Sequence, residues 1–311
     1  MYKSRGLNNK VFRRKLLMSF AFNFKFLYIM TNALENCSFI DIKKFKVINV
    51  QDKTIDNGKF FDWGRVSQDY ARYRDIYPPV FYERIAERNL CVKGQKALDL
   101  GTGTGVLPRN LYRYGASWTG TDISPEQIEQ AKRLADERNM KIDFRAVPAE
   151  ELDFPRDSFD VITACQCFWY FDHKRLAPKL EELLKPEGRL LILYMAWLPS
   201  EDSIAKRSEE LVLKYSPGWT GAGETRHPIE LPDAVLDCFE LESHEEYDLT
   251  VPFTRESWHG RMRACRGVGA SLTEAELAKW DKEHRSLLER TAPERFHILH
   301  YAASAVLKKK R

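Results

Sequence analysis

The clearest place for chemistry in this chain is a glycine-rich segment that follows an apolar run. Residues 97–105 read ALDLGTGTG. Gly101, Gly103 and Gly105 allow a sharp turn and a close approach of the backbone to a ligand. Asp122 follows Gly101 by 21 residues, at the end of the next apolar run. There a carboxylate can accept both ribose hydroxyls of a nucleoside. The pattern predicts a nucleoside site, and a tight turn without a ligand is the alternative.

Two details distinguish this segment from a dinucleotide-binding loop. The glycines fall as G-x-G-x-G, and Val106 stands where G-x-G-x-x-G requires its third glycine. Asp99 places a carboxylate at the end of the strand, which suits an ammonium group of the ligand better than a pyrophosphate. We therefore assign Asp99, Thr102 and the three loop glycines to ligand binding. A nicotinamide oxidoreductase is the weaker alternative.

The elements that must position these residues alternate between apolar runs and helical periodicity. This alternation predicts a doubly wound α/β fold with a mostly parallel seven-stranded sheet. Ser124-Pro125 with Gln127 is typical of a helix N-terminus, and Thr254 and Thr273 are further candidate N-caps. We expect strands over residues 96–100, 117–121, 142–147, 161–167, 189–194, 239–249 and 297–307, and helices over 79–88, 107–114, 125 onward and 174–184.

The distribution of charge limits the classes of partner. The chain of 311 residues has a net charge of +4, but residues 60–311 carry 37 basic and 41 acidic side chains. A slightly acidic body argues against a duplex nucleic-acid binder, which needs clustered positive charge. The apolar run Leu16–Phe24 is interrupted by Lys25 and is too short to span a bilayer, so we expect no stable membrane insertion. Six scattered cysteines suit reduced thiols in a cytoplasmic protein.

From Phe61 to its C-terminus the sequence resembles the class I S-adenosylmethionine-dependent methyltransferases, most closely over residues 96–194. The resemblance implies a Rossmann-like methyltransferase fold with S-adenosyl-L-methionine as cofactor. In such proteins the backbone of the glycine loop faces the methionine part of the cofactor. Asp122 matches the residue that binds the ribose, and Ile123 matches the residue that packs on the adenine.

Further segments carry the resemblance in the same order along the chain. Ala149 and Glu150 match the segment after the third strand that borders the adenine, although Pro148 stands where the family often has Asp. Residues 157–161 and 184–190 match the entries into strands four and five. Tyr70 and Arg74 resemble the lead-in of small-molecule methyltransferases related to trans-aconitate methyltransferase, which reaches over the cofactor. Ordinary helix packing is the alternative for this pair.

Aromatic residues follow the fourth predicted strand in the run Cys165–Asp172. Trp169 and Tyr170 could line the acceptor site, since aromatic faces attract a sulfonium cation; core packing is their alternative. Trp169 stands where relatives often have a His, so we assign no catalytic residue. Cys165 is expected to line the cofactor pocket. Alternate residues of a strand point to opposite faces, so Cys165 and Cys167 should not share a metal ion, and we expect no metal site.

The acceptor side is expected from the segments beyond strand five. Trp197 follows that strand at the end where α/β sheets bind ligands. Trp219 and Arg261 lie in segments that should fold over the site, and Arg261 could hold an anionic acceptor. A solvated helix face is the alternative for such arginines. The same reasoning applies to Arg226, Trp258, Arg263 and Arg266.

Together these features predict methyl transfer from S-adenosylmethionine to a small-molecule acceptor. We expect residues 1–58 to be a poorly structured basic extension, 59–197 the cofactor-binding core, and 198–311 a helical cover with the closing strands of the same domain. A non-catalytic S-adenosylmethionine-binding sensor or partner protein is the main alternative. An RNA methyltransferase is disfavoured by the absence of a basic face. The fold does not identify the acceptor, and the oligomeric state leaves no sequence signal.

Overall fold

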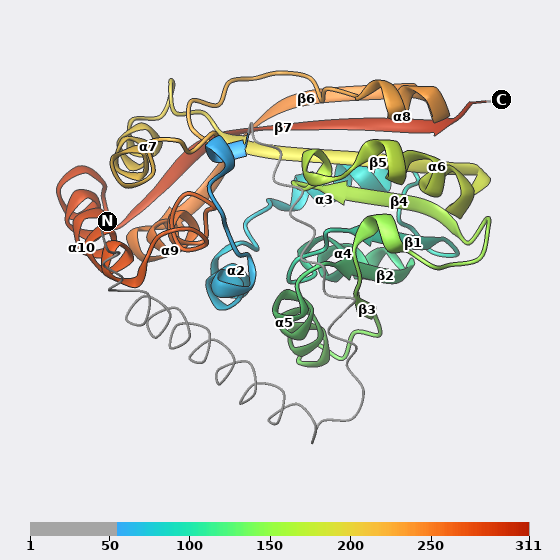
Figure 1. The fold of residues 1–311 in the computed structure, drawn as a ribbon, viewed down its shortest axis with the longest axis horizontal. Helices are drawn as coiled ribbons and strands as arrows, with labels where there is room; N and C mark the ends of the chain where they lie inside the picture. Colours follow the sequence, from blue (N-terminus) through green and yellow to red (C-terminus); the bar gives the residue numbers. More distant parts are fainter. Residues whose placement is uncertain (1–54, 311) are drawn as a thin grey trace, which may run out of the picture. The chain divides into compact units, whose positions relative to one another are not determined.

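A single seven-stranded sheet organises the computed structural model, which describes residues 55–310 (Figure 1). The strand order is β3-β2-β1-β4-β5-β7-β6. The first five strands pair in parallel, and β7 pairs antiparallel with β5 and β6. The strands are β1 Lys96–Leu100, β2 Ser117–Asp122, β3 Asp143–Ala146, β4 Phe159–Cys165, β5 Leu184–Trp197, β6 Phe239–Thr254 and β7 Arg295–Lys309. This architecture confirms the predicted fold.

Helices flank the sheet on both faces and gather beyond one end of it. The helix α3 packs in one core cluster, while α6 and α8 pack in a second cluster on the opposite face. In Figure 1, α2, α7, α9 and α10 lie beyond the end toward which β4 and β5 run. The helices are α2 Ser67–Tyr73, α3 Pro79–Glu87, α4 Val106–Leu111, α5 Pro125–Asp136, α6 His173–Leu183, α7 Ser203–Tyr215, α8 Asp233–Cys238, α9 Arg255–Arg263 and α10 Glu274–Thr291.

The helix N-caps follow the predicted chemistry. The Ser124 hydroxyl accepts the backbone N–H of Gln127 at 3.3 Å, with Pro125 at the first helical position. Thr254 and Thr273 each form a reciprocal capping box. The Gln127 side chain instead donates to the Trp63 carbonyl at 3.0 Å, so it ties α5 to the segment before α2.

The last two strands are longer than predicted. β6 continues to Thr254 because it pairs with β7 along its whole length, from Phe239 opposite Lys309 to Thr254 opposite Arg295. Pro252 is compatible with this position because β6 is an edge strand, where a missing N–H costs no ladder bond on the open side.

Alternate residues of β5 enter different core clusters, as expected for a strand covered on both faces. Leu191, Leu193, Met195 and Trp197 belong to the larger cluster, and Leu190 and Ile192 to the second. The larger cluster continues into α7, α9 and α10, so the helical cover shares one core with the sheet.

The described chain begins with a short turn, Ile55–Gly58, in which Asp56 and Asn57 have positive φ and which belongs to the folded body. Asp56 is buried and accepts from Arg266 Nε at 2.6 Å and from the Thr220 backbone N–H at 2.8 Å. The predicted basic extension covers residues 1–58, but these contacts assign residues 55–58 to the domain. Residues 1–54, which make up the rest of that extension, lie outside the described residues.

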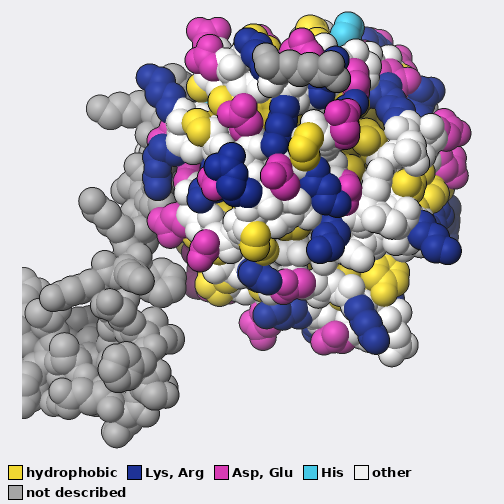
Figure 2. All heavy atoms as spheres, turned by 90° about the vertical axis from the view of Figure 1, so that its right-hand side faces the viewer, with side chains coloured by type: hydrophobic (Ala, Val, Ile, Leu, Met, Phe, Trp, Pro, Cys, Tyr) yellow, Lys and Arg dark blue, Asp and Glu magenta, His cyan; other side chains and the backbone are white. Residues whose placement is uncertain are grey.

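The surface shows no large area of one charge on the face drawn in Figure 2, where Lys and Arg are interspersed with Asp and Glu. Charged side chains also pair between elements, for example Arg189 of β5 with Glu242 of β6 at 2.7 Å and Lys185 of β5 with Asp160 of β4 at 2.8 Å. Among residues 55–310, no helix is both long and apolar enough to cross a bilayer.

Candidate functional site

The glycine loop after β1 uses left-handed backbone at all three glycines. Gly101 and Gly103 have φ of +55° and Gly105 has φ of +74°, a region that residues with a Cβ adopt only with strain. A Cβ at Gly101 would come within 2.8 Å of Cys167, and one at Gly105 within 2.6 Å of the Phe144 ring. Those two glycines are therefore required by packing as well, whereas Gly103 faces a less crowded side.

Asp99 holds this loop from the interior. It is 2 % exposed, and its two carboxylate oxygens accept the hydroxyls of Thr102 and Thr163, each at 2.6 Å. Burial raises the pKa of Asp99 to about 7, against the opposing effect of the two hydroxyls. Thr102 is also buried, and its backbone N–H donates to the Thr121 carbonyl at 2.8 Å. Both residues shape the loop, and contact of Asp99 with a ligand ammonium stays a prediction.

Asp122 connects the end of β2 to the glycine loop. Its carboxylate accepts the backbone N–H of Gly103 at 2.8 Å and that of Ser124 at 2.9 Å. Burial raises the pKa of Asp122, and the backbone donors oppose that rise. A carboxylate has about four lone-pair positions, so the backbone donors of Gly103, Ser124 and Ile123 leave acceptor capacity for a ligand hydroxyl. Beside it Ile123 is 55 % exposed, an apolar surface next to the acid.

The predicted lead-in residues lie against the loop. A Cβ at Gly103 would meet the Tyr70 ring at 3.5 Å, so Tyr70 covers that glycine. Arg74 Nη2 donates to the Tyr70 hydroxyl at 3.0 Å, and its guanidinium carbon is 4.6 Å from the centre of the same ring. Tyr73, on the other hand, packs against Gly260 of α9. Helix α2 thus joins the loop to the cover.

The segment after β3 lies next to Asp122. The Val147 backbone N–H donates to the Asp122 carbonyl at 2.9 Å. Ala149 is 6 % exposed and begins a short helix that ends at Glu151. The Glu150 carboxylate accepts the Asp172 backbone N–H at 2.9 Å. Glu150 therefore links this segment to the residues after β4, and its predicted role toward an adenine stays a prediction.

The two cysteines at the end of β4 enter different surroundings. Cys165 Sγ lies 3.6 Å from the Tyr77 hydroxyl, and burial raises the pKa of Cys165 to about 12. Cys167 Sγ lies 3.1 Å from the Leu100 carbonyl oxygen and packs against Gly101. Between them Gln166 has a φ of +66°. No group of three His, Cys, Asp or Glu that could hold a metal ion occurs among residues 55–310.

The aromatic residues after β4 separate in the structure. Trp169 is 41 % exposed and meets Tyr194 edge to face, with ring centres 4.9 Å apart. The Tyr170 hydroxyl accepts from Arg266, and its ring contacts Phe61 at 6.2 Å. Trp169 is the open member of this run, while Tyr170 is anchored to the cover.

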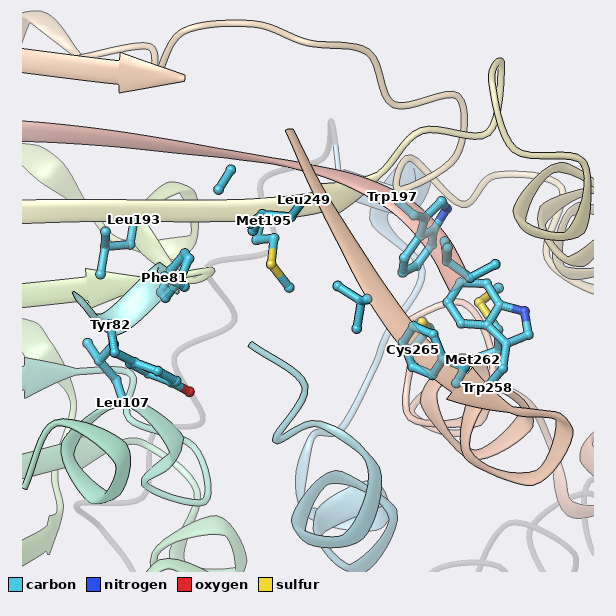
Figure 3. Packing of buried hydrophobic residues seen from close by; sticks show 14 of the residues in the cluster. Phe81, Tyr82, Leu107, Leu193, Met195, Trp197, Leu249, Trp258, Met262 and Cys265 are labelled. Atoms are coloured by element: carbon cyan, nitrogen blue, oxygen red, sulfur yellow. The ribbon is translucent and has the colours of Figure 1, made fainter. Parts of the chain in front are cut away.

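Trp197 and Trp219 are buried in the core. Trp197 is 6 % exposed, donates to the Glu209 carboxylate, and meets Trp258 edge to face at 5.5 Å. Figure 3 shows Trp197 and Trp258 near each other at the cover end of the larger cluster. Trp219 is 7 % exposed and packs on Gly221 and Gly267. Core packing therefore accounts for much of what these indoles contact.

Arg261 and Arg266 of the cover do not lie on a solvated helix face. Arg263 pairs with Asp69 at 2.9 Å, and Arg266 pairs with Asp56. Arg226 is paired on the surface with Asp248 at 2.7 Å, away from the core. Arg261 is 6 % exposed and lies over the Trp197 ring at 4.8 Å. The alternative of a solvated face is thus wrong for Arg261 and Arg266.

Comparison with known proteins identifies relatives of the segment that contains the glycine loop. Residues 98–192 match a family model described as a methyltransferase domain. Over these residues the chain is therefore similar to methyltransferase domains. A ubiquinone biosynthesis O-methyltransferase of Rhodopseudomonas palustris is 31 % identical over 140 residues, which cover 45 % of this chain and 55 % of the relative. One from Actinobacillus pleuropneumoniae is 29 % identical over 203 residues, covering 61 % and 84 %.

The match to these methyltransferases is partial in length. The chain spans about half the length of the first of them, 55 %. Among solved structures, a proposed methyltransferase of Bacillus halodurans aligns with a TM-score of 0.46 at 16 % identity, covering 75 % of this chain and 98 % of the other.

Several residues near the site were not singled out from the sequence. Asp56 has no local signal, because its partner Arg266 is 210 residues away. Gln166 adopts positive φ although it is not one of the residue types that commonly do so. His300 is buried in β7, and its chain neighbours read as an ordinary apolar strand. The contact of Tyr77 with Cys165 joins residues 88 positions apart, so it requires the fold.

Proposed function

We propose that this methyltransferase binds S-adenosylmethionine across the ends of β1 and β2 and transfers its methyl group to a small-molecule acceptor. The observation that carries the proposal is the bridge from Asp122 to the backbone of Gly103 and Ser124. It places a carboxylate with free lone pairs beside a left-handed glycine loop and the exposed Ile123. A hydroxyl-bearing nucleoside matches this combination of groups.

The residues present fit each part of this cofactor. Asp122 would accept the ribose hydroxyls, and Ile123 with the segment at Ala149 would border the adenine. The backbone of the loop at Gly103 would face the methionine part, and Arg74 next to Tyr70 supplies a cation for its carboxylate. When bound, the cofactor supplies an electrophilic methyl group on a sulfonium.

The protein's own contribution is to bind, orient and exclude water. Tyr70 covers the loop at Gly103, and the Trp63 ring meets the Tyr70 ring edge to face with centres 5.9 Å apart. These two aromatic rings shield the Gly103 side of the loop from water. The raised pKa of Cys165 keeps that thiol protonated at neutral pH, which removes it as a nucleophile or base. We assign no general base. Acceptors with an accessible lone pair or an anionic oxygen suit such a site, provided that they lie in line with the methyl group.

The test is methyl transfer from labelled S-adenosylmethionine to a panel of thiols, amines, phenols and carboxylates, with mass identification of the product. Phenols are included because the similar proteins are named as O-methyltransferases. We expect label on at least one acceptor class. Cofactor binding without transfer to any class would favour the non-catalytic sensor.

Two glycine variants provide a matched control for this assay. Gly103 and Gly94 both have positive φ, and a Cβ would cause no close clash at either. Gly94 lies before β1, at the opposite end of that strand from the loop. Both Ala substitutions place a Cβ at a positive φ, but only the one at Gly103 lies in the loop under Tyr70, so Gly103→Ala should lose transfer while Gly94→Ala retains it. Equal activity of the two variants would contradict the placement of the cofactor.

A further inference from the structure

One buried arginine of the cover has no counter-ion among residues 55–310. Arg109, Arg261 and Arg266 are the buried arginines among residues 55–310. Arg109 lies 3.5 Å from Asp75, and Arg266 lies 2.6 Å from Asp56. Arg261 has no ion pair with any described carboxylate; its Nη1 lies 3.2 Å from Cys265 Sγ, and its Nε has no hydrogen-bond partner. A charge buried in this way lowers stability unless something binds to it.

The surroundings of Arg261 are aromatic and apolar. Its guanidinium carbon lies 4.8 Å from the centre of the Trp197 ring, and Trp197 in turn contacts Trp258. Figure 3 shows these two indoles with Met262 and Cys265 at the same end of the core. Burial and the charge of Arg74 lower the pKa of Arg261 to about 10, so the group is still cationic at neutral pH. The cation thus faces an aromatic ring, and no carboxylate of the described residues pairs with it.

A second unpartnered polar atom adjoins the same ring. His300 pairs with Trp197 across β5 and β7, and it is 1 % exposed. Its Nδ1 lies 3.0 Å from the Ile298 carbonyl oxygen, so Nδ1 carries the hydrogen and Nε2 carries a lone pair. Burial lowers the pKa of His300 to about 3, which keeps the ring neutral. Nε2 has no partner among the described residues and can accept a hydroxyl.

Both atoms lie near the residues that cover the cofactor loop. Arg74, which bonds to Tyr70 over Gly103, is close enough for its charge to lower the pKa of both Arg261 and His300. A ligand that reached these two unpartnered atoms would therefore be next to the loop, on the side of the helical cover. That is the side from which an acceptor must approach if the cofactor occupies the loop.

We propose that Arg261 and His300 bind the methyl acceptor, and that the acceptor is a hydroxycarboxylic acid with an apolar body. Its carboxylate pairs with Arg261, its hydroxyl donates to His300 Nε2, and its apolar part contacts Trp197. This assignment rests on the proposed function, since it concerns the acceptor side of that same site. It gives the unpaired cation and the unpaired lone pair one common ligand.

The test uses two hydroxy acids, salicylate and mandelate, as probes in calorimetric titrations. Benzoate and phenylacetate lack the hydroxyl, while phenol and benzyl alcohol lack the carboxylate. Each titration is run with and without S-adenosylhomocysteine. Wild type should bind a hydroxy acid more tightly than either of its matched probes. Arg261→Met should weaken binding of the acids roughly ten- to a hundredfold, the loss for a hydrogen bond to a charged group, and leave the alcohols unchanged.

Further variants separate binding from structure. His300→Phe should reduce the affinity for a hydroxy acid to that for the acid without the hydroxyl. Arg290 is exposed near the end of α10 and bonds only to Ser286 of its own helix in the described chain, so Arg290→Met serves as the control with unchanged affinities. Without ligand, Arg261→Met should melt at or above the wild-type temperature, because an unpaired buried charge has been removed.

The outcomes that overturn the proposal are distinct from failure of the proposed function. Acids that bind neither wild type nor its complex with S-adenosylhomocysteine refute it. So does unchanged acid affinity in Arg261→Met together with a lower melting temperature, which assigns the arginine to structure. If Arg261→Met weakens S-adenosylhomocysteine but not methylthioadenosine, which lacks the amino-acid part, Arg261 binds the cofactor's carboxylate and the acceptor assignment is wrong. Hydroxy-acid binding that depends on Arg261, without any nucleoside binding, refutes the proposed function and leaves a hydroxy-acid site that is not an acceptor site.

Discussion

Replacing Asp122 with Ala tests the cofactor site through two separate quantities. In the free protein this carboxylate accepts backbone N–H groups from Gly103 at 2.8 Å and Ser124 at 2.9 Å. Its removal leaves two partly buried donors without an acceptor. Water replaces part of the loss, so we expect the free energy of unfolding to fall by about 1–3 kcal/mol. For a domain of this size each kcal/mol lowers the melting temperature by about 2–4 °C.

The same substitution should weaken the binding of S-adenosylhomocysteine. Hydrogen bonds from ribose hydroxyls to a carboxylate contribute about 1.5–3 kcal/mol, so the dissociation constant should rise roughly ten- to a hundredfold. Asp160→Ala is the matched control. The Asp160 carboxylate also accepts a backbone N–H, that of Lys96 at 2.8 Å, but Lys96 lies at the beginning of β1, at the opposite end of the strand from the glycine loop. The control should lose stability and keep its affinity. Folded Asp122→Ala with wild-type affinity in calorimetry, or an equal affinity loss in both variants, would refute the reasoning.

Three further predictions concern stability measured by urea denaturation. Trp197→Ala should lower the free energy of unfolding by about 3–5 kcal/mol because the indole is buried, whereas Trp169→Ala should change it by less than about 0.5 kcal/mol; similar losses would contradict the burial. The pKa of Asp99 is raised from its ordinary value of 3.8 to about 7 in the native state. Between about pH 4 and pH 7 this carboxyl is therefore protonated in the folded protein and ionised in the unfolded chain. The free energy of unfolding of the wild type should therefore fall, relative to that of Asp99→Asn, as the pH rises from about 4 to about 7. An equal pH dependence of the free energy of unfolding in the two proteins would contradict this. Asp56→Ala should cost about 3–5 kcal/mol by leaving Arg266 buried without a counter-ion, and a loss below about 1 kcal/mol would be inconsistent with that ion pair.

The parts of the site that were predictable depend on short-range chemistry. The glycine loop and Asp122 are recognisable because the turn requires positive φ and the acid stands at a fixed distance along a strand–helix–strand unit. Likewise Thr254 and Thr273 form their caps with residues three positions on, so the sequence contains both partners. The alternation of strands and helices predicts the sheet for the same reason.

The parts that were not predictable depend on which distant residues meet. Arg261, Arg263 and Arg266 lie within six positions of each other. Arg263 is paired with Asp69 and Arg266 with Asp56, whereas Arg261 has no counter-ion in the described part of the chain. No local sequence pattern distinguishes the paired arginines from the unpaired one, because the two carboxylate partners come from the first described elements of the chain. Burial at the ends of β4 and β5 also depends on distant residues. Trp197, the last residue of β5, is buried by the helices of the cover, whereas Trp169, after β4, is exposed.

The most direct test of the central claim is a calorimetric titration of the full chain with S-adenosylhomocysteine, alongside one with NAD. The loop at Gly103 with Asp122 at its side predicts saturable binding of the sulfur nucleoside at one site per chain, and no heat of binding from NAD. Saturable binding of NAD with no response to S-adenosylhomocysteine would contradict the assignment of this loop to a methyltransferase cofactor.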